Sequence, residues 1–472
     1  MTGNPERDTD DSLAEGPAGL VDGAGRRVWK AGTLVYTGAG LAALFCWLLW
    51  GDFAWYMRDR ATMPLAQLLL KQFGAGDFVV GTLVGSLPAA LAMLLGPVIS
   101  VYSDRHRGRW GRRIPFLLIP TPIAVLTIVA MAYTPELARA LEISLGVHSP
   151  GTNACRLLVF SVLWTLFEVF AVTANAIFGA LINDVVPHLL IGRFFSMFRA
   201  VGLLAGIVFN FWVIGHAEQH YRSIFIGVGL LYGLGFGAMC LGVKEGEYGP
   251  VSQRPQRPGG SSWTIPLSSY FRDCFTHSYY VLIYAAWLTV NACPAAMNSF
   301  SVIYAKSIGL NMTAYGQLLV ITFVISFVIA YPIGWMTDRF HPLRVGGIAI
   351  GLYAALSLWA GLWASTAGAF SIALVGHGVL SGAIYTSTAS LMQRLFPKEK
   401  FAQFASAAIG IASLGLLIVP PMMGAILDAT GHAYRETFIA GGALATVGAF
   451  LFAVVYRRFL ALGGHEAYRP PK

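Results

Sequence analysis

Long apolar stretches recur along this chain and constrain its fold more than any other feature. An α-helix rises about 1.5 Å per residue, so about 20 apolar residues cross the ~30 Å hydrocarbon core of a bilayer. Only 12% of the 472 residues are charged, against roughly 25% in an average soluble domain. The sequence therefore predicts an all-α membrane protein with twelve transmembrane helices. The predicted spans are residues 42–72, 78–102, 113–134, 155–182, 192–215, 223–243, 277–305, 314–337, 343–365, 369–395, 401–427 and 435–460.

The first predicted span contains three charged residues in a row, Arg58-Asp59-Arg60. Hydropathy alone would end this helix near Met57 and leave residues 64–73 as an unusually apolar loop. We therefore expect one longer helix that carries the charges inside it. An early helix end followed by an outer loop is the alternative.

The distribution of basic residues predicts the orientation of the helices. With an even number of spans both termini share a side, and the segments on that side hold 23 Lys and Arg residues against six on the other. Loops rich in Lys and Arg stay on the cytoplasmic side of a membrane. We therefore expect both termini in the cytoplasm. The net charge of +9 then reflects these loops rather than nucleic-acid binding.

The chain divides into two six-span halves with a repeated sequence pattern. Ser103-Asp104-Arg105 follows span 2 as Thr337-Asp338-Arg339 follows span 8, and the sequence RPQRPGGSS between the halves has the composition of a linker. Repeated six-helix halves are typical of transporters that rock about a site near the membrane midplane. The predicted parts are a disordered tail (1–28), an N-terminal bundle (29–243), a linker (244–276), a C-terminal bundle (277–460) and a second tail (461–472).

The loop after the second span carries the most specific motif, DRHRGRWGRRIPF at residues 104–116. This loop resembles the signature loop of the major facilitator superfamily. Its form D-R-x(3)-R-x-G-R-R-x-P-F is similar to that of the glycoside–pentoside–hexuronide cation symporters and the sucrose-transporter-like sugar/proton symporters. Residues 51–54 (GDFA) are similar to a segment of the melibiose branch, and residues 334–339 (GWMTDR) fit the general superfamily form. The resemblance covers about residues 40–460 and implies the major facilitator fold with two pseudo-symmetric halves.

Departures from the family pattern bear on the coupling ion. Ser100 stands where the general signature has Gly, and the paired Asp residues of the sodium-coupled melibiose branch fall on Ala92 and Gly96. Span 2 has no acidic residue before Asp104. A sodium ion needs several oxygen ligands, whereas a proton needs one titratable acid. The proton is therefore the expected coupling ion.

Ionisable residues at membrane depth are candidates for coupling, because an unpartnered charge there costs on the order of 3 kcal/mol. Asp52, Tyr56 and Asp59 share one face of the first span, and Arg58 lies on an adjacent face. We predict that Asp52 or Asp59 is the proton-coupling acid and that Arg58 tunes it by proximity. Glu168, deep in span 4, completes the predicted set. A fixed structural ion pair is the alternative.

Polar and aromatic residues in several spans are candidates for binding the solute. Trp287, Asn291 and Asn298 share a face of span 7 around Pro294, which kinks the helix because it has no N–H to donate. Amides suit hydroxyl-rich ligands because each both donates and accepts hydrogen bonds. The alternative is ordinary helix packing, or a satisfied hydrogen bond in the case of the histidine. The predicted solute-binding residues are Tyr56, Arg58, Asn175, Trp287, Asn291, Asn298 and His377.

Carboxylates and arginines also gather at the cytoplasmic ends of the spans. Ion pairs at such positions can be made and broken as the halves move. Simple positive-inside anchoring is the alternative. The predicted cytoplasmic gate consists of Asp104, Arg105, Arg112, Arg113, Asp184, Arg193, Arg199, Asp338 and Arg339.

The resemblance and these residues together predict a secondary transporter that imports a di- or oligosaccharide or glycoside by proton symport. We expect no enzymatic activity, no cofactor, no metal and no nucleic-acid partner, because no ATP-binding GxxxxGK[ST] motif or metalloenzyme spacing is found. Arg outnumbers Lys by 25 to 7, which suggests a GC-rich bacterial genome and hence the inner membrane. We expect the protein to act there as a monomer. The open alternatives are a carboxylate-bearing solute, which Arg58 and Arg60 would suit, and a membrane sensor that transports nothing.

Overall fold

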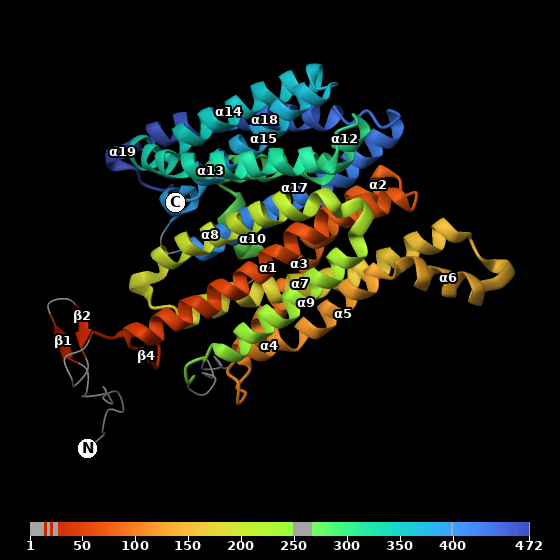
Figure 1. The fold of residues 1–472 in the computed structure, drawn as a ribbon. Helices are drawn as coiled ribbons and strands as arrows, with labels where there is room; N and C mark the ends of the chain where they lie inside the picture. The colour runs from red at the N-terminus through yellow and green to blue at the C-terminus, as the bar shows by residue number, and fades with distance from the viewer. Residues whose placement is uncertain (1–13, 17–18, 22–26, 249–266, 398–399, 472) are drawn as a thin grey trace.

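The computed structural model describes residues 14–16, 19–21, 27–248, 267–397 and 400–471, and its spans are all helical. Figure 1 shows the first six spans (red to light green) below the last six (cyan to blue). Strand β4 and helix α19 lie at the left of this view, and α2, α6 and α12 lie at the right. We call the end that holds β4 and α19 the termini side and the opposite end the far side.

The N-terminal half begins with two short antiparallel pairs, β1 (Ala14–Gly16) with β2 (Gly19–Val21) and β3 (Trp29–Ala31) with β4 (Leu34–Tyr36). The first pair lies within the predicted tail 1–28, whose other residues up to 26 are outside the described residues. The helices that follow are α1 (Gly38–Gln72), α2 (Asp77–Val80), η1 (Gly81–Ser86), α3 (Leu87–Arg105), α4 (Ile114–Leu118), α5 (Pro120–Ala132), α6 (Thr134–Leu145), η2 (Gly146–His148), α7 (Thr152–Val185), η3 (His188–Leu190), α8 (Ile191–Val208), η4 (Phe209–Val213), η5 (Ile214–His216) and α9 (Ala217–Gly242).

The C-terminal half repeats the arrangement. Pro294 separates α11 from α12, as the sequence predicts, because its ring removes one helical hydrogen bond. Helix α10 lies within the predicted linker 244–276, of which residues 249–266 are outside the described residues. The helices are α10 (Leu267–Phe275), α11 (Ser278–Ala292), α12 (Ala295–Ser307), α13 (Met312–Phe340), α14 (Pro342–Trp363), α15 (Ala367–Thr388), α16 (Leu391–Leu395), α17 (Phe401–Ala429), α18 (Glu436–Ala461) and α19 (Gly464–Ala467).

The number of spans in the described chain agrees with the prediction. Eleven helical stretches are long and apolar enough to cross a membrane, and one of them runs over 55 residues, His188–Gly242. A single helix of that length would measure about 80 Å, more than twice the hydrocarbon thickness. The 3₁₀ turn η5 and the non-helical backbone at His220 (φ −122°, ψ 24°) divide it into two spans. Twelve spans in two halves confirm the predicted fold class.

Two segments of the N-terminal half bear on the predicted spans. Helix α1 runs unbroken over 35 residues to Gln72, so the long first helix is confirmed. The predicted spans 113–134 and 155–182 leave residues 135–154 between them, and this connection contains the amphipathic helix α6 (Thr134–Leu145). Its length of 12 residues is too short to span a bilayer, which is why a search for spans passes over it.

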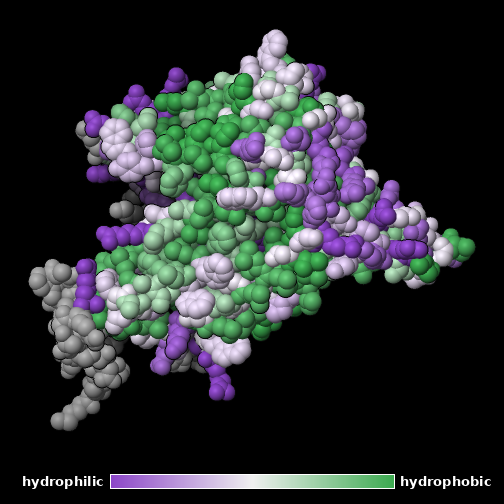
Figure 2. Space-filling view, viewed as in Figure 1, coloured by the Kyte–Doolittle hydropathy of each residue, from purple (hydrophilic) through white to green (hydrophobic). Residues whose placement is uncertain are grey.

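Membrane-facing side chains form an apolar belt. Figure 2 shows hydrophobic residues over the middle of one face, with hydrophilic residues mostly toward the two ends. Large side chains such as Leu94, Ile119, Leu126 and Leu234 are each more than 60% exposed. Exposure of this kind is unfavourable in water and is expected where lipid is the solvent.

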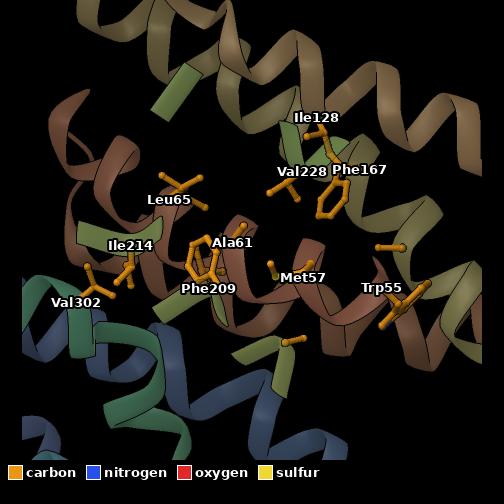
Figure 3. Packing of buried hydrophobic residues seen from close by; sticks show 14 of the residues in the cluster. Trp55, Met57, Ala61, Leu65, Ile128, Phe167, Phe209, Ile214, Val228 and Val302 are labelled. Carbon is orange, nitrogen blue, oxygen red and sulfur yellow. The ribbon is translucent and has the colours of Figure 1, made fainter. Parts of the chain in front are cut away.

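The buried apolar residues form two clusters. The larger one joins the whole N-terminal half to the far-side ends of the C-terminal helices, and the smaller one fills the termini side of the C-terminal half. Figure 3 shows part of the larger cluster, where Ala61 and Leu65 of α1 lie near Phe209 and Ile214, with Val302 of α12 beyond them. Among the described residues, the two halves therefore share an apolar core on the far side.

Glycines allow the closest approaches between the halves. A Cβ at Gly81 would lie 2.3 Å from the Pro420 carbonyl oxygen, and one at Gly316 would lie 2.1 Å from the Asn210 carbonyl oxygen. Gly81 lies in η1 and Asn210 in η4, and both segments are π-helical. Spans 2 and 5 thus meet α17 and α13 of the other half at wide helical turns, which occur mostly at functional positions.

Replacing Gly81 by Val should open the far side, because backbone atoms of Pro420 block the new side chain. Overpacking of this kind costs roughly 1–3 kcal/mol. Spin labels at Gln72 and Arg435, both exposed on the far side in opposite halves, should move apart in double electron–electron resonance. Gly96→Val is the matched control, since a Cβ at Gly96 of the same span meets nothing within 4 Å. Equal distances in both variants would contradict the prediction.

Candidate functional site

The charged residues of α1 separate into two environments. Tyr56 packs on α8, where its ring lies 6.1 Å from that of Phe198 and a Cβ at Gly202 would touch it. The charged groups that act on Tyr56 are two acids and two arginines, Asp52, Asp59, Arg60 and Arg199. We call Asp52, Tyr56, Asp59, Arg60 and Arg199 the mixed-charge cluster of α1 and α8, after the two helices that supply them.

Asp52 and Asp59 differ in their access to solvent. Asp52 is fully buried, and neither carboxylate oxygen has a hydrogen-bond partner among the described residues. Asp59 is exposed although it lies well inside a membrane span. An ionised carboxylate without a donor is far more costly to bury than a neutral acid. Asp52 is therefore suited to carry a proton, and Asp59 is suited to meet water or solute.

Arg58 lies inside the N-terminal half, away from the other half. Its guanidinium carbon is 3.8 Å from the ring centre of Trp55, 5.0 Å from that of Tyr232 and 5.5 Å from that of Phe167. Only 2% of its surface is exposed. The charges of Arg58 and Asp59 act on Glu168, which is also buried. This aromatic cage supports a role for Arg58 inside the bundle rather than contact with a solute.

Arg60 and Arg199, by contrast, reach toward the C-terminal half. Arg60 is half-buried and its guanidinium carbon lies 5.0 Å from the ring centre of Phe323 on α13. Arg199 is exposed and donates to the Thr386 hydroxyl on α15 at 3.2 Å. Asn175 of α7 is exposed as well. Arg60 and Arg199 are therefore placed to face a solute between the halves, whereas for Asn175 the structure gives exposure but no contact with the other half.

The polar residues of span 7 meet the predicted histidine. His377 of α15 is buried, and its Nε2 lies 3.0 Å from Asn298 Oδ1 while its Nδ1 lies 2.9 Å from the Tyr353 hydroxyl. Asn298 is exposed on α12, although its neighbours on both sides are buried. Gln67 of α1 donates to the Asn298 carbonyl oxygen at 3.2 Å. Asn298 therefore lies where the two halves meet.

Whereas His377 engages the amide oxygen of Asn298, Asn291 leaves its own amide oxygen free among the described residues. Its Nδ2 donates to the Trp287 carbonyl oxygen at 2.9 Å, one helical turn back. Its Oδ1 has no hydrogen-bond partner in the described parts of the chain and is left as an acceptor. Trp287 and Asn291 are both half-buried. Span 7 thus offers one amide acceptor and one amide donor to the same side.

Most of the predicted gate residues form ion pairs within their own half. Arg112 and Arg113 both bind Asp184 (2.7 and 3.0 Å), and Arg113 also binds Asp104 at 2.6 Å. Glu245 accepts three backbone N–H groups, those of Arg112, Arg113 and Ile114. We call Asp104, Arg112, Arg113, Asp184 and Glu245 the termini-side clamp, which ties the loop after span 2 to the end of span 4.

The C-terminal half has a simpler counterpart of the clamp. Asp338 pairs with Arg394 at 2.8 Å, and Arg339 lies over the rings of Trp335 and Phe340. Arg394 stands three residues before Pro397, as Asp184 stands three before Pro187. Arg105 lies at the end of α3, and Arg193 is exposed at the start of α8. Glu245 and Arg394 were not among the predicted gate residues, although the repeat between the halves marks the position of Arg394.

A second group of charges, absent from the predictions, joins the halves on the far side. Asp77 of α2 is fully buried and binds Lys71 (2.8 Å), His432 Nδ1 (2.6 Å) and the Tyr434 hydroxyl (3.2 Å). Burial and the Asp77 carboxylate raise the pKa of Tyr434, which keeps this hydroxyl a donor. We call Lys71, Asp77, Asp428, His432 and Tyr434 the far-side latch.

Asp428 completes this latch by capping a helix of the other half. Helix α2 begins after Gly76, which has no side chain to cap it, and Asp428 accepts the Asp77 and Phe78 N–H groups at 2.7 and 2.9 Å. Negative charge is favourable at a helix N-terminus. The ligand atoms of Asp77, Asp428 and His432 are close enough to hold a metal ion, but Lys71 already supplies positive charge to Asp77.

Comparisons with known proteins agree with this architecture. The family described as MFS/sugar transport protein matches residues 68–399. An uncharacterized MFS-type transporter of Mycobacterium tuberculosis, Rv1250, is 27% identical over 167 residues, which cover 35% of this chain and 28% of that protein.

Solved structures agree in fold at lower identity. A mutant form of the nucleoside transporter NupG superposes with a TM-score of 0.64 at 12% identity, covering 88% of this chain and 100% of that one. A bacterial homolog of the human lysosomal transporter Spinster, in an inward-facing conformation, gives 0.60 at 15% identity over 91% of this chain and 99% of that one. Identities this low show a shared fold and leave the solute undefined.

Removing the charge of Asp77 should weaken far-side closure. Asp77→Asn loses the charge-assisted bonds to Lys71 and His432, and we expect about 2 kcal/mol less stabilisation of the closed far side. Spin labels at Gln72 and Arg435 should show a larger population at long distance. Glu136→Gln is the control, because Glu136 pairs with Arg222 inside one half. An unchanged distance distribution for Asp77→Asn would show that the latch does not hold the halves together.

Proposed function

Because the chain belongs to the MFS/sugar transport protein family, and is thus a membrane transporter of the major facilitator type, we propose that it imports a sugar together with a proton. The observation that carries the sugar assignment is the amide pair of span 7. Asn298 offers a donor and Asn291 an acceptor on the same side of the helix. The two positions lie about 10 Å apart along the helix, so hydroxyls at separate positions of a di- or oligosaccharide can accept from the first and donate to the second.

The closed far side supports alternating access. With both termini in the cytoplasm, as the basic-residue count predicts, the far side with its contacts between the halves would face the outside, and solute would be released inward. Outward opening would require the far-side latch to break and the two halves to part along η1 and η4. The proposed setting is a bacterial inner membrane, with the protein acting as a monomer.

Asp52 is the proposed proton carrier. It is buried without a hydrogen-bond donor among the described residues and lies one helical turn from Tyr56 in the mixed-charge cluster of α1 and α8. Asp59, exposed on the same helix, would receive or pass on the proton. Arg60 and Arg199 support a second candidate function, import of a carboxylate-bearing sugar such as a uronide, because both reach toward the other half.

The decisive measurement is uptake of labelled solutes into proteoliposomes with and without an inward proton gradient. A gradient of one pH unit supplies about 1.4 kcal/mol per proton, enough for about tenfold accumulation. Accumulation of a neutral sugar would support the proposal. Accumulation of only uronides would favour the second candidate, and absence of any uptake by folded, inserted protein would favour the sensor alternative.

Asp52→Asn should abolish gradient-driven accumulation but leave sugar exchange across the membrane, because the neutral amide mimics the protonated acid and cannot release a proton. Counterflow and gradient-driven uptake measured side by side would separate the two activities. Asp59→Asn should reduce coupling less, since Asp59 is exposed to solvent. Glu142→Gln on the exposed helix α6 is the control. Full proton-driven uptake by both Asp variants would exclude this carrier assignment.

A further inference from the structure

A chain of hydrogen bonds links the proposed solute-facing amide to residues that do not face the solute. It runs from the Tyr353 hydroxyl of α14 through the imidazole of His377 to Asn298 Oδ1. The Asn298 carbonyl oxygen is in turn held by Gln67 of the opposite half. Tyr353 and His377 are 1% and 4% exposed, so solvent has little access to the hydrogen bonds that join them to Asn298.

The shortest contacts among Tyr353, His377 and Asn298 fit one order of hydrogen-bond donors and acceptors. An amide oxygen only accepts, so the bond to Asn298 Oδ1 requires a proton on His377 Nε2. A neutral imidazole then has an unprotonated Nδ1, which can accept from the Tyr353 hydroxyl. This hydroxyl has one hydrogen and two acceptors within reach, His377 Nδ1 at 2.9 Å and the Cys293 carbonyl oxygen at 3.3 Å, and the shorter contact favours donation to Nδ1. The rings of Tyr353 and Phe438, with centres 5.6 and 6.3 Å from that of His377, hold the imidazole in place.

This order fixes the direction of the Asn298 amide. Its oxygen is occupied by His377, and its Nδ2 has no partner in the described part of the chain. Rotating the amide by half a turn would place its NH₂ group against the Nε2–H of His377, donor against donor. Asn298 therefore offers only N–H groups to a solute between the halves.

We propose that His377 is a positioning residue that orients Asn298 as a pure hydrogen-bond donor and so selects solutes with an acceptor oxygen at that point. The proposal rests on the proposed function, because it assumes that the solute passes between the halves beside span 7. Asn298 selects by contact, and His377 acts through Asn298. The bond from Gln67 adds a link to the transport cycle, since it can exist only while the far side is closed.

Singly modified sugars test this selection. Fluorine in place of a hydroxyl accepts a weak hydrogen bond and cannot donate, and hydrogen in its place does neither. At one ring position the fluoro analogue should compete for wild-type uptake about twofold better than the deoxy analogue, the low end of the range for one hydrogen bond, because fluorine is a weak acceptor. In His377→Leu, which removes the donor, this ratio should fall to about one at the same position.

Two further variants separate orientation from simple packing. Tyr353→Phe keeps the imidazole but removes the donor to Nδ1, so both neutral tautomers become available and the ratio should also fall. Ser371→Ala removes a hydroxyl on the same helix as His377 that donates only to the Ala367 carbonyl oxygen among the described residues, so the ratio should stay at its wild-type value. An unchanged fluoro-to-deoxy ratio in both His377→Leu and Tyr353→Phe would overturn the proposal.

A spectroscopic readout keeps the proposal testable if the solute is not a sugar. In ¹⁵N-histidine-labelled protein, the signal lost in His377→Leu should have the shifts of a neutral imidazole protonated at Nε2. Protonation at Nδ1 instead would overturn the orientation of Asn298. Absence of sugar uptake by wild-type protein together with the Nε2 tautomer would reject the proposed sugar and leave the role of His377 standing.

Discussion

The hydrocarbon core of the bilayer provides no hydrogen-bond partners, and every polar group placed in it needs a partner from the protein, a solute or water. In most of this chain the helices themselves meet that requirement. The exceptions gather on α1 and span 7, where Asp52 has no donor among the described residues and Asn298 has a free NH₂ group. A transporter needs such incomplete positions, because a site that is already satisfied gains little by binding a proton or a solute.

The same requirement explains how the halves hold together. On the far side, apolar residues of both halves share one core, and buried Asp77 finds partners on α1 and on the loop after α17. Asp428 caps a helix that cannot cap itself. On the termini side the strongest ion pairs stay within each half. The ion pairs that stabilise each half are therefore separate from the far-side ion pairs, which hold the two halves together.

Sequence reasoning predicted the spans because their physical basis is local. Apolar run length and the kink at Pro294 depend on neighbouring residues only, and both agree with the structure. The far-side latch was missed because it joins Asp77 to Asp428, which are more than 300 residues apart and have no distinctive local pattern. The cage of Arg58 was missed for a similar reason, since helical spacing cannot tell an aromatic interior from the space between halves.

The π-helical segments η1 and η4 have a consequence for how such a molecule moves. Such a turn holds an extra residue, and shifting one residue along a helix rotates the side chains that follow by about 100°. In spans 2 and 5 that extra residue lies where each touches the opposite half. These helices can therefore twist at their points of contact while most of their backbone bonds stay intact. If the extra residue moved along each helix, torsion within these two helices would add to any rotation of the halves as rigid bodies.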